Sequence, residues 1–273
     1  MMPRKEEVRI FKKASRTFYY ASRLFPRAAR DDIFTLYAFV RTIDDFVDCT
    51  PQDRAGFEAF TDDLWEAHRS GSSSDPIIAR FVELWIRVGF ERSWVDAFLQ
   101  AMESDFEKRE YRTLKETEHY MYGSAEVIGL MITRVLGVSE KSAPYARSLG
   151  RAFQYINMIR DVSEDLSLGR RYLPLTEMKR YGLESLEHQY VRENEGAFRL
   201  FVHAQLAHFE RWLRQSRAGF TYLPKRSRMA IETSCRLYEW TAQVIKDDPL
   251  IIYERKVKPP THVIVRETAR SVL

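Results

Sequence analysis

Residues 32–49 read DIFTLYAFVRTIDDFVDC and predict an amphipathic helix with one acidic face. At about 100° per residue, four polar side chains fall within about 60° of one another: Tyr37, Arg41, Asp44 and Asp48. Asp45 lies at the edge of this group. The apolar side chains form a separate stripe on the opposite side: Phe39, Ile43, Phe46 and Val47. One face of the helix can therefore pack in a core while the other carries acidic chemistry.

Residues 154–174 read QYINMIRDVSEDLSLGRRYLP and repeat this design. Four polar side chains share a face of about 80°: Gln154, Asn157, Asp161 and Asp165. The apolar side chains of the segment point the other way. Each of the two predicted helices thus presents an Asp-x-x-x-Asp pair, with its aspartates at i and i+4.

Paired carboxylates at this spacing need a positive partner. Like charges at i, i+4 destabilise a helix by about 0.2–0.5 kcal/mol, and burying unpaired carboxylates costs several kcal/mol each. Carboxylate oxygens suit Mg²⁺, which typically bridges protein carboxylates and substrate phosphates. Nearby arginines suit the remaining phosphate oxygens: Arg41, Arg160, Arg170 and Arg171. From the spacing alone, a solvated surface face with arginine partners remains the alternative.

The rest of the chain predicts one soluble all-α domain spanning residues 1–273. Helical periodicity dominates the sequence and no repeat of 20–50 residues is visible. We expect helices at 5–24, 31–48, 52–70, 76–88, 93–109, 115–137, 140–166, 196–218 and 225–246. The tail from Asp247 is expected to be an extended arm or a short helix.

Charge, cysteine content and hydropathy exclude several classes of protein. The chain of 273 residues has 43 Lys and Arg against 39 Asp and Glu, a net charge of +4 that is too weak and too dispersed to indicate a nucleic-acid partner. Its two cysteines, Cys49 and Cys235, cannot build a disulfide framework. Neither a signal peptide nor a spanning helix is visible, so we expect a cytoplasmic protein.

Four separated motifs resemble the squalene/phytoene synthase family, whose members join two prenyl diphosphates head to head. They are SRTFYYASRLFP (15–26), YAFVRTIDDFVD (37–48), YMYGSAEVIGLM (120–131) and NMIRDVSEDLSLGRRYLP (157–174). The resemblance covers about Ser15 to Lys246. It implies an all-α isoprenoid-synthase helical bundle around a central cavity, with prenyl diphosphates as substrates and Mg²⁺, or Mn²⁺ in its place, as cofactor.

The resemblance also implies roles for individual residues. The metal ligands would be Asp44, Asp45, Asp48, Asn157, Asp161 and Asp165. Four of these aspartates would also be catalytic, namely Asp44, Asp48, Asp161 and Asp165. Tyr120 would be catalytic with them, because it matches a family tyrosine that assists proton transfer. Substrate contacts would be Arg16, Tyr37, Arg41, Asn157, Arg160, Arg170 and Tyr172. The sequence departs from the family at two places. Arg16 stands where a lysine is common, and Glu126 stands where a small residue is usual and is expected to be a structural helix residue or an added ligand.

The expected product is phytoene, formed from geranylgeranyl diphosphate through prephytoene diphosphate. The alternatives are farnesyl diphosphate giving squalene or dehydrosqualene, a prenyl-diphosphate phosphatase or terpene cyclase, and a non-catalytic assembly protein of the same fold. NADPH is expected only if squalene is the product, and no Gly-rich dinucleotide motif is present. Six residues are candidate cavity walls, and ordinary core packing is an equal expectation for each: Phe18, Phe34, Tyr37, Val127, Leu130 and Met131. The basic N-terminal helix is a candidate for peripheral membrane contact, against the alternative of a solvated face; the oligomeric state is left open.

Overall fold

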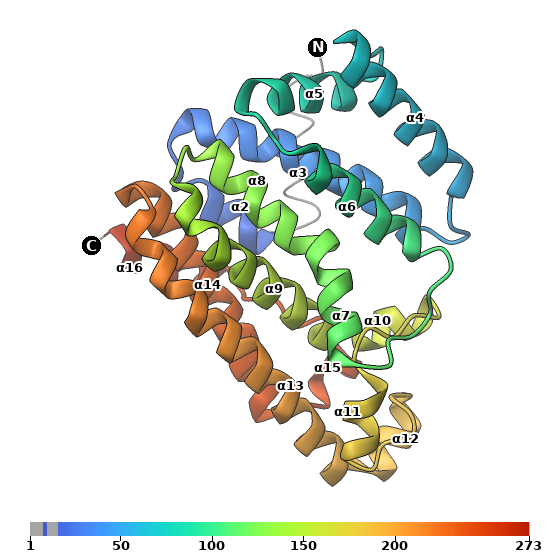
Figure 1. Cartoon of the computed structure of the whole chain (residues 1–273). Helices are drawn as coiled ribbons and strands as arrows, with labels where there is room; N and C mark the ends of the chain where they lie inside the picture. The colour runs from blue at the N-terminus through green and yellow to red at the C-terminus, as the bar shows by residue number, and fades with distance from the viewer. Residues whose placement is uncertain (1–7, 10–15, 273) are drawn as a thin grey trace.

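The computed structural model describes residues 8–9 and 16–272, and these residues are almost entirely helical (Figure 1). The first half of the chain forms α2 (Arg16–Ser22), α3 (Arg27–Asp48), α4 (Arg54–Ser70), α5 (Pro76–Val88), α6 (Arg92–Ser104), α7 (Leu114–Met121), the π-turn η1 (Tyr122–Glu126) and α8 (Val127–Val135). The second half forms η2 (Glu140–Ser142), α9 (Ala143–Arg160), α10 (Val162–Ser167), α11 (Leu175–Arg180), α12 (His188–Glu193), α13 (Glu195–Ser216), η3 (Arg217–Tyr222), α14 (Lys225–Asp247), α15 (Ile251–Glu254) and α16 (Thr261–Val272). The expected all-α class is confirmed.

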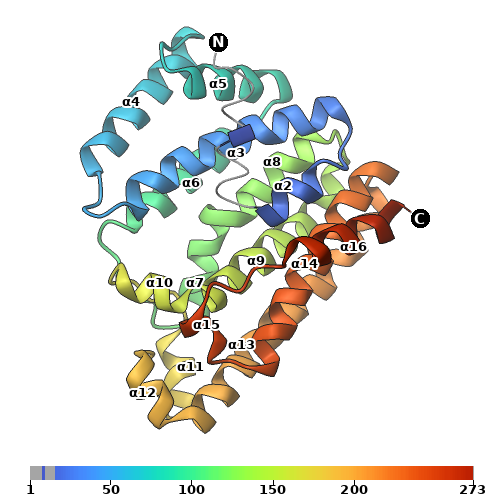
Figure 2. The same ribbon diagram turned by 180° about the vertical axis from the view of Figure 1, so that it is seen from behind.

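The long helices form a bundle with α9 in its interior. Helix α9 packs against α13, α8 and η1, while α14 packs against α2 and α16. The hairpin of α4 and α5 lies beyond α3 at one end, and α11 and α12 lie at the opposite end (Figures 1 and 2). Buried side chains from Phe25 to Val257 form one continuous apolar cluster in the described part of the chain. In the ranges 8–9 and 16–272, no helix has both the length and the hydropathy needed to cross a bilayer.

Local sequence signals set the ends of α4 and α5. The Asp53 carboxylate accepts a hydrogen bond from the Gly56 amide at 2.8 Å, and Asp75 accepts one from the Ile77 amide at 2.7 Å, just before a proline in the first turn. Such caps satisfy amides that have no partner within the helix. Helix α4 ends at Gly71, whose φ of 81° suits a residue without a side chain. Both helices agree with the expected ranges 52–70 and 76–88.

The expected helix 115–137 is interrupted by the π-turn η1. Gly123 lies in this turn at its closest approach to α6, where a Cβ atom would be 2.3 Å from the Ala97 carbonyl oxygen. The turn therefore lets α7 and α8 pass closely over α6, which periodicity alone does not predict. Helix α6 in turn ends at Ser104, earlier than expected, because Asp105 leaves the helix and binds side chains of other segments.

Two short helices, α11 and α12, lie where no helix is expected, and α15 is a short helix in the tail after Asp247, where a short helix is one of the two expectations. Each has at most six residues, too few for a period of 3.6 to repeat clearly. The C-terminal run of β-branched residues forms α16, and Val263 and Ile264 bury their side chains against Leu237 of α14. The tail is thus partly helical because α14 offers it an apolar face.

Candidate active site

A cavity of about 1090 Å³ runs along α9 through the bundle. Its lining includes residues of α9 from Tyr145 to Arg160, a stretch of 15 residue steps and therefore about 22 Å of helix. Apolar and small side chains surround the Tyr145 end: Leu136, Leu149, Gly219, Phe220 and Leu223. The aspartates of both motifs surround the other end. The cavity is therefore a long apolar chamber with an acidic end.

Helix α3 contributes the first acidic group to this end of the cavity. All five residues of its predicted polar face line the cavity: Tyr37, Arg41, Asp44, Asp45 and Asp48. The Arg41 guanidinium lies 3.9 Å from the Asp44 carboxylate and 3.7 Å from the Asp48 carboxylate, and it also pairs with Asp45. Burial and the neighbouring Asp48 raise the pKa of Asp44 to about 8, even though Arg41 opposes the shift.

The second acidic group comes from the end of α9 and the start of α10. The helix breaks at Asp161, and Gln154, Asn157, Asp161 and Asp165 all line the cavity. The Arg160 guanidinium holds the Asp161 carboxylate through two hydrogen bonds, of which the bond from Nε is 2.8 Å long. Burial, and then the charge of Asp161, raise the pKa of Asp165 well above its usual value. The expected single helix 140–166 is thus two helices that keep their acidic side chains on one cavity.

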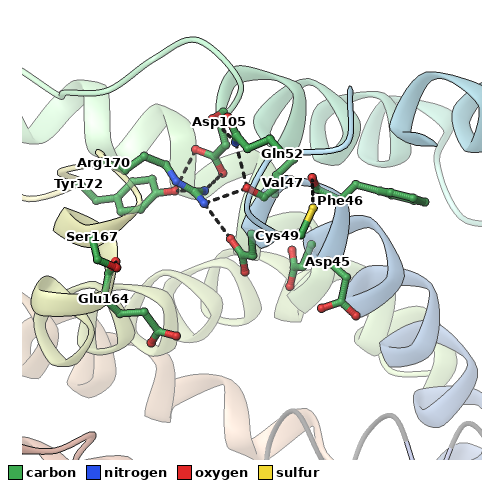
Figure 3. Close-up of polar contacts among 12 residues, drawn as sticks. Asp45, Phe46, Val47, Cys49, Gln52, Asp105, Glu164, Ser167, Arg170 and Tyr172 are labelled. Carbon is green, nitrogen blue, oxygen red and sulfur yellow. Dashed lines mark hydrogen bonds and ion pairs between the residues drawn. The ribbon is translucent and has the colours of Figure 1, made fainter. Parts of the chain in front are cut away.

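The Arg170 guanidinium links the end of α3 to Asp105 and Tyr172 (Figure 3). One terminal nitrogen donates to the Asp48 carboxylate and to the Val47 carbonyl oxygen, both at 3.0 Å. The other donates to the Tyr172 hydroxyl at 3.0 Å and lies 3.5 Å from the Asp105 carboxylate. The family resemblance implies a direct diphosphate contact for Arg170. Its side chain is only 3% exposed and does not line the cavity, although its partners Asp48 and Tyr172 do.

Asp105 is a site residue that the sequence analysis missed. Its carboxylate accepts hydrogen bonds from the Tyr120 hydroxyl at 2.7 Å and from the Tyr172 hydroxyl at 2.9 Å, and it lines the cavity although it is only 2% exposed. Burial raises its pKa to about 6, against the opposing effect of Tyr120 and Arg170. Burial also raises the pKa of Tyr120 well above its usual value, so this hydroxyl stays protonated.

The segment after α15 supplies two cavity lysines that were also missed. Lys256 lies 3.4 Å from the Asp161 carboxylate and pairs with Glu164. Lys258 lines the cavity as well, and burial followed by the neighbouring Lys256 lowers its pKa. The sequence contains a signal for this segment, because two lysines directly before Pro259-Pro260 indicate an extended basic segment rather than one face of a helix.

Several candidate residues lie away from the cavity or outside the described part of the chain. Arg16 begins α2, but its side chain lies outside the described residues, as do most of the basic residues of the N-terminal segment. Arg171 faces away from the cavity and pairs with Glu110 at 2.7 Å. Glu126 is fully buried between Arg147 and Arg151, which confirms the structural interpretation of this residue.

Four of the expected cavity walls belong to the core instead. Phe34, Val127, Leu130 and Met131 are buried and do not line the cavity, whereas Phe18 and Tyr37 do. Helix α8 faces the cavity with its other side, through Ile128, Gly129 and Ile132. Both sides of this helix are apolar, so the sequence could not show which one faces the cavity.

The acidic end of the cavity fits a divalent cation. The Asn157 Oδ1 atom is buried and has no hydrogen-bond partner in the described structure. Burial, and then the neighbouring carboxylates Asp48 and Asp161, raise the pKa values of Asp44 and Asp165, so a cation here would relieve both effects. Oxygen donors from amide and carboxylate groups are the ligands that Mg²⁺ prefers. Within the described ranges, no three His, Cys, Asp or Glu side chains already converge as a preformed metal site.

Comparison with known proteins identifies the family. Residues 11–262 match the family described as squalene/phytoene synthase. The chain belongs to this family. It is 29% identical to a 15-cis-phytoene synthase from Pantoea ananas and 30% identical to a phytoene synthase from Pseudescherichia vulneris, in each case over 82% of this chain and 76% of the relative. Family members and these relatives are prenyltransferases, so this squalene/phytoene synthase family member is an enzyme of that type.

Solved structures agree on the fold. A dehydrosqualene synthase superposes with a TM-score of 0.86 at 22% identity, covering 98% of this chain and 95% of the other. A squalene synthase from Alicyclobacillus acidocaldarius superposes with a TM-score of 0.79 at 20% identity, covering 89% and 93%. The expected isoprenoid-synthase bundle is therefore confirmed.

Proposed function

We propose that this enzyme is a Mg²⁺-dependent phytoene synthase that condenses two molecules of geranylgeranyl diphosphate. The observation that carries the proposal is the cavity of about 1090 Å³, which joins an acidic end to an apolar chamber. Pockets for small ligands usually measure about 300–1,000 Å³, so this cavity is large and its length along α9 suits long prenyl chains. The similarity to named phytoene synthases supports the choice of the C20 substrate.

The proposed metal ligands are the oxygen donors that face the acidic end: Asp44, Asp45, Asp48, Asn157, Asp161 and Asp165. When bound there, Mg²⁺ would neutralise the diphosphate leaving group and so favour breakage of the allylic C–O bond. Arg41 and Arg160 lie beside these carboxylates and would orient the diphosphates. Lys256, beside Asp161, and Lys258 would add positive charge to the cavity.

The remaining cavity residues would protect and guide the carbocation. Apolar walls exclude water, which would otherwise capture the cation as an alcohol. The acceptor double bond attacks the allylic cation, a proton leaves, and a cyclopropylcarbinyl diphosphate forms. Its diphosphate then leaves, the skeleton rearranges, and a second proton loss gives phytoene. Tyr120 faces the cavity with its hydroxyl hydrogen-bonded to a carboxylate, which suits proton transfer.

The apolar substrate and product also support peripheral contact with a membrane surface, which we include in the proposal. Such contact would let a hydrocarbon leave the cavity without crossing water. Flotation of the protein with anionic vesicles, compared with the same experiment at high salt, tests this part separately.

The decisive experiment incubates purified protein with Mg²⁺ and either geranylgeranyl or farnesyl diphosphate, with and without NADPH, and identifies extracted products by mass spectrometry. We expect a C40 hydrocarbon that forms without NADPH. A C30 hydrocarbon would replace the substrate with farnesyl diphosphate, and its dependence on NADPH would separate squalene from dehydrosqualene. A prenyl alcohol alone would indicate a phosphatase, and no product would indicate a non-catalytic relative.

Two variants test the metal ligands within the same assay. Asp44→Asn and Asp161→Asn are expected to abolish turnover with little loss of helicity. Asp62→Asn is the matched control, because Asp62 is an exposed carboxylate of α4 away from the cavity. Wild-type turnover in either cavity variant would contradict the metal assignment.

A further inference from the structure

Tyr120 cannot act as a base on its own in this cavity. The Tyr120 side chain is buried, and burial together with the charge of Asp105 raises its pKa well above the usual value. A phenolate is therefore not available to take a proton. A neutral phenol can accept a proton only if it gives up its own in the same step, and this requires an acceptor behind it.

Asp105 is placed to be that acceptor. Its Oδ2 atom lies 2.7 Å from the Tyr120 hydroxyl, and this is the hydrogen bond the hydroxyl donates. With the donor proton directed at Asp105, the remaining lone pairs of the Tyr120 oxygen are available to accept a proton. No other carboxylate in the described structure accepts a hydrogen bond from Tyr120.

The surroundings of Asp105 hold this geometry. Its Oδ1 atom accepts a hydrogen bond from Tyr172 at 2.9 Å, and its backbone carbonyl accepts one from the Gln52 side chain at 3.0 Å. Tyr111 packs its ring against the rings of Tyr120 and Tyr172, with centroids 5.4 Å and 5.6 Å apart. Each carboxylate oxygen thus has a tyrosine hydroxyl as its partner, and both Tyr120 and Asp105 line the cavity.

We infer that Asp105 is the terminal proton acceptor of the first condensation, acting through Tyr120. The inference rests on the proposed function. In this step a C–H bond at C1 of the donor-derived prenyl unit breaks, and its electron pair forms the C–C bond that closes the cyclopropane ring. The proton goes to the Tyr120 oxygen while the Tyr120 proton goes to Asp105 Oδ2, which becomes a carboxylic acid. The released diphosphate takes this proton by the reverse relay before the next turnover.

Asp105 acts through another residue and is therefore a positioning and relay residue rather than a group that touches the substrate. The competing interpretation is that it only supports the fold around Arg170. The two interpretations differ in what Asp105→Asn does to the chemical step, because a relay residue changes proton transfer specifically. Kinetics with a substrate deuterated at C1 report on that step.

The test compares wild-type enzyme, Asp105→Asn, Tyr120→Phe and the double variant, each with Mg²⁺ and protonated or C1-deuterated prenyl diphosphate. We expect Asp105→Asn to lower kcat by about 100-fold or more with KM changed less than about threefold, and to raise the deuterium isotope effect on kcat. The double variant is expected to be no slower than Tyr120→Phe, since both changes break one relay. Glu126→Gln removes another buried carboxylate, outside the cavity, and is expected to leave the isotope effect unchanged.

Wild-type kcat in Asp105→Asn would overturn the inference, and so would an unchanged isotope effect with additive losses in the double variant. If Asp105→Asn does not fold, Asp105→Glu keeps the negative charge beside Arg170 and displaces the carboxylate from Tyr120. It should then lower kcat in the wild-type background but not in the Tyr120→Phe background, and equal losses in both would overturn the inference. Failure of the wild-type enzyme to form any condensed product would instead refute the proposed function.

Discussion

Replacing Arg170 with Gln should strongly destabilise the protein because the arginine is buried among groups that need its charge. The change removes the cation 3.5 Å from the buried Asp105 carboxylate and the donors to the Val47 carbonyl and the Tyr172 hydroxyl. Breaking a buried pair by removing one partner costs about 3–5 kcal/mol. The ion pair with the partly exposed Asp48 adds less than about 1 kcal/mol.

Urea unfolding followed by circular dichroism measures this loss. With an m-value of about 3 kcal/mol/M, a loss of about 3–5 kcal/mol lowers the midpoint by about 1–1.7 M. Arg171→Gln is the matched control one residue later, because its partner Glu110 is exposed and its ion pair contributes about 1 kcal/mol or less. Equal midpoints for Arg170→Gln and wild type would refute the reasoning that this guanidinium compensates a buried charge.

Three further predictions follow from the site and its packing. Burial raises the pKa of Asp44 in the folded protein to about 8, above the unfolded value of 3.8. With divalent metal removed by a chelator, this carboxyl group therefore lowers the stability of the fold progressively as pH rises from about 4 to 8. Thermal melts over this pH range should show the loss, and the Asp44→Asn variant should not. Gly150→Ala should destabilise the protein by about 1–3 kcal/mol, because its Cβ would lie 2.5 Å from the Ala125 carbonyl oxygen, whereas Gly196→Ala, in open space on α13, should stabilise it by about 0.5–1 kcal/mol in the same urea titration. Lys256→Gln should raise KM for the prenyl diphosphate by about tenfold, as expected for loss of one charge-assisted hydrogen bond, and an unchanged KM would place Lys256 outside the diphosphate site.

Helical periodicity was sufficient to group the acidic side chains of each segment on one face, whereas the cavity that both faces share is a finding of the structure. The spacing of Asp44 and Asp48 determines which side of α3 they occupy, and a helix with one apolar side has only one way to face the core. The break between α9 and α10 at Asp161 was not predicted, although Asp161 and Asp165 both still line the cavity. Capping residues likewise determined where α4 and α5 begin. These features depend on residues within a few positions of one another, which a single sequence displays directly.

The missed residues depend on contacts between distant segments. Asp105 binds Tyr120, 15 residues later, and Tyr172, 67 residues later, so no local pattern distinguishes it from other surface-prone aspartates. Lys256 reaches Asp161 only because the chain after α15 returns to the acidic end. The choice of the wrong side of α8 has the same origin, since only the positions of α3 and α9 decide which apolar side meets the cavity.

The ion pair between Arg170 and Asp48 joins residues 122 positions apart, and this separation has a consequence for synthesis of the chain in the cell. Contacts between distant residues close large loops and tend to form late in folding. While a ribosome is still adding the residues up to Arg170, α3 has no partner for its acidic end, and the apolar walls of the later helices do not yet exist. We expect the nascent N-terminal half to expose apolar surface during this interval and to depend on chaperones until the second half emerges.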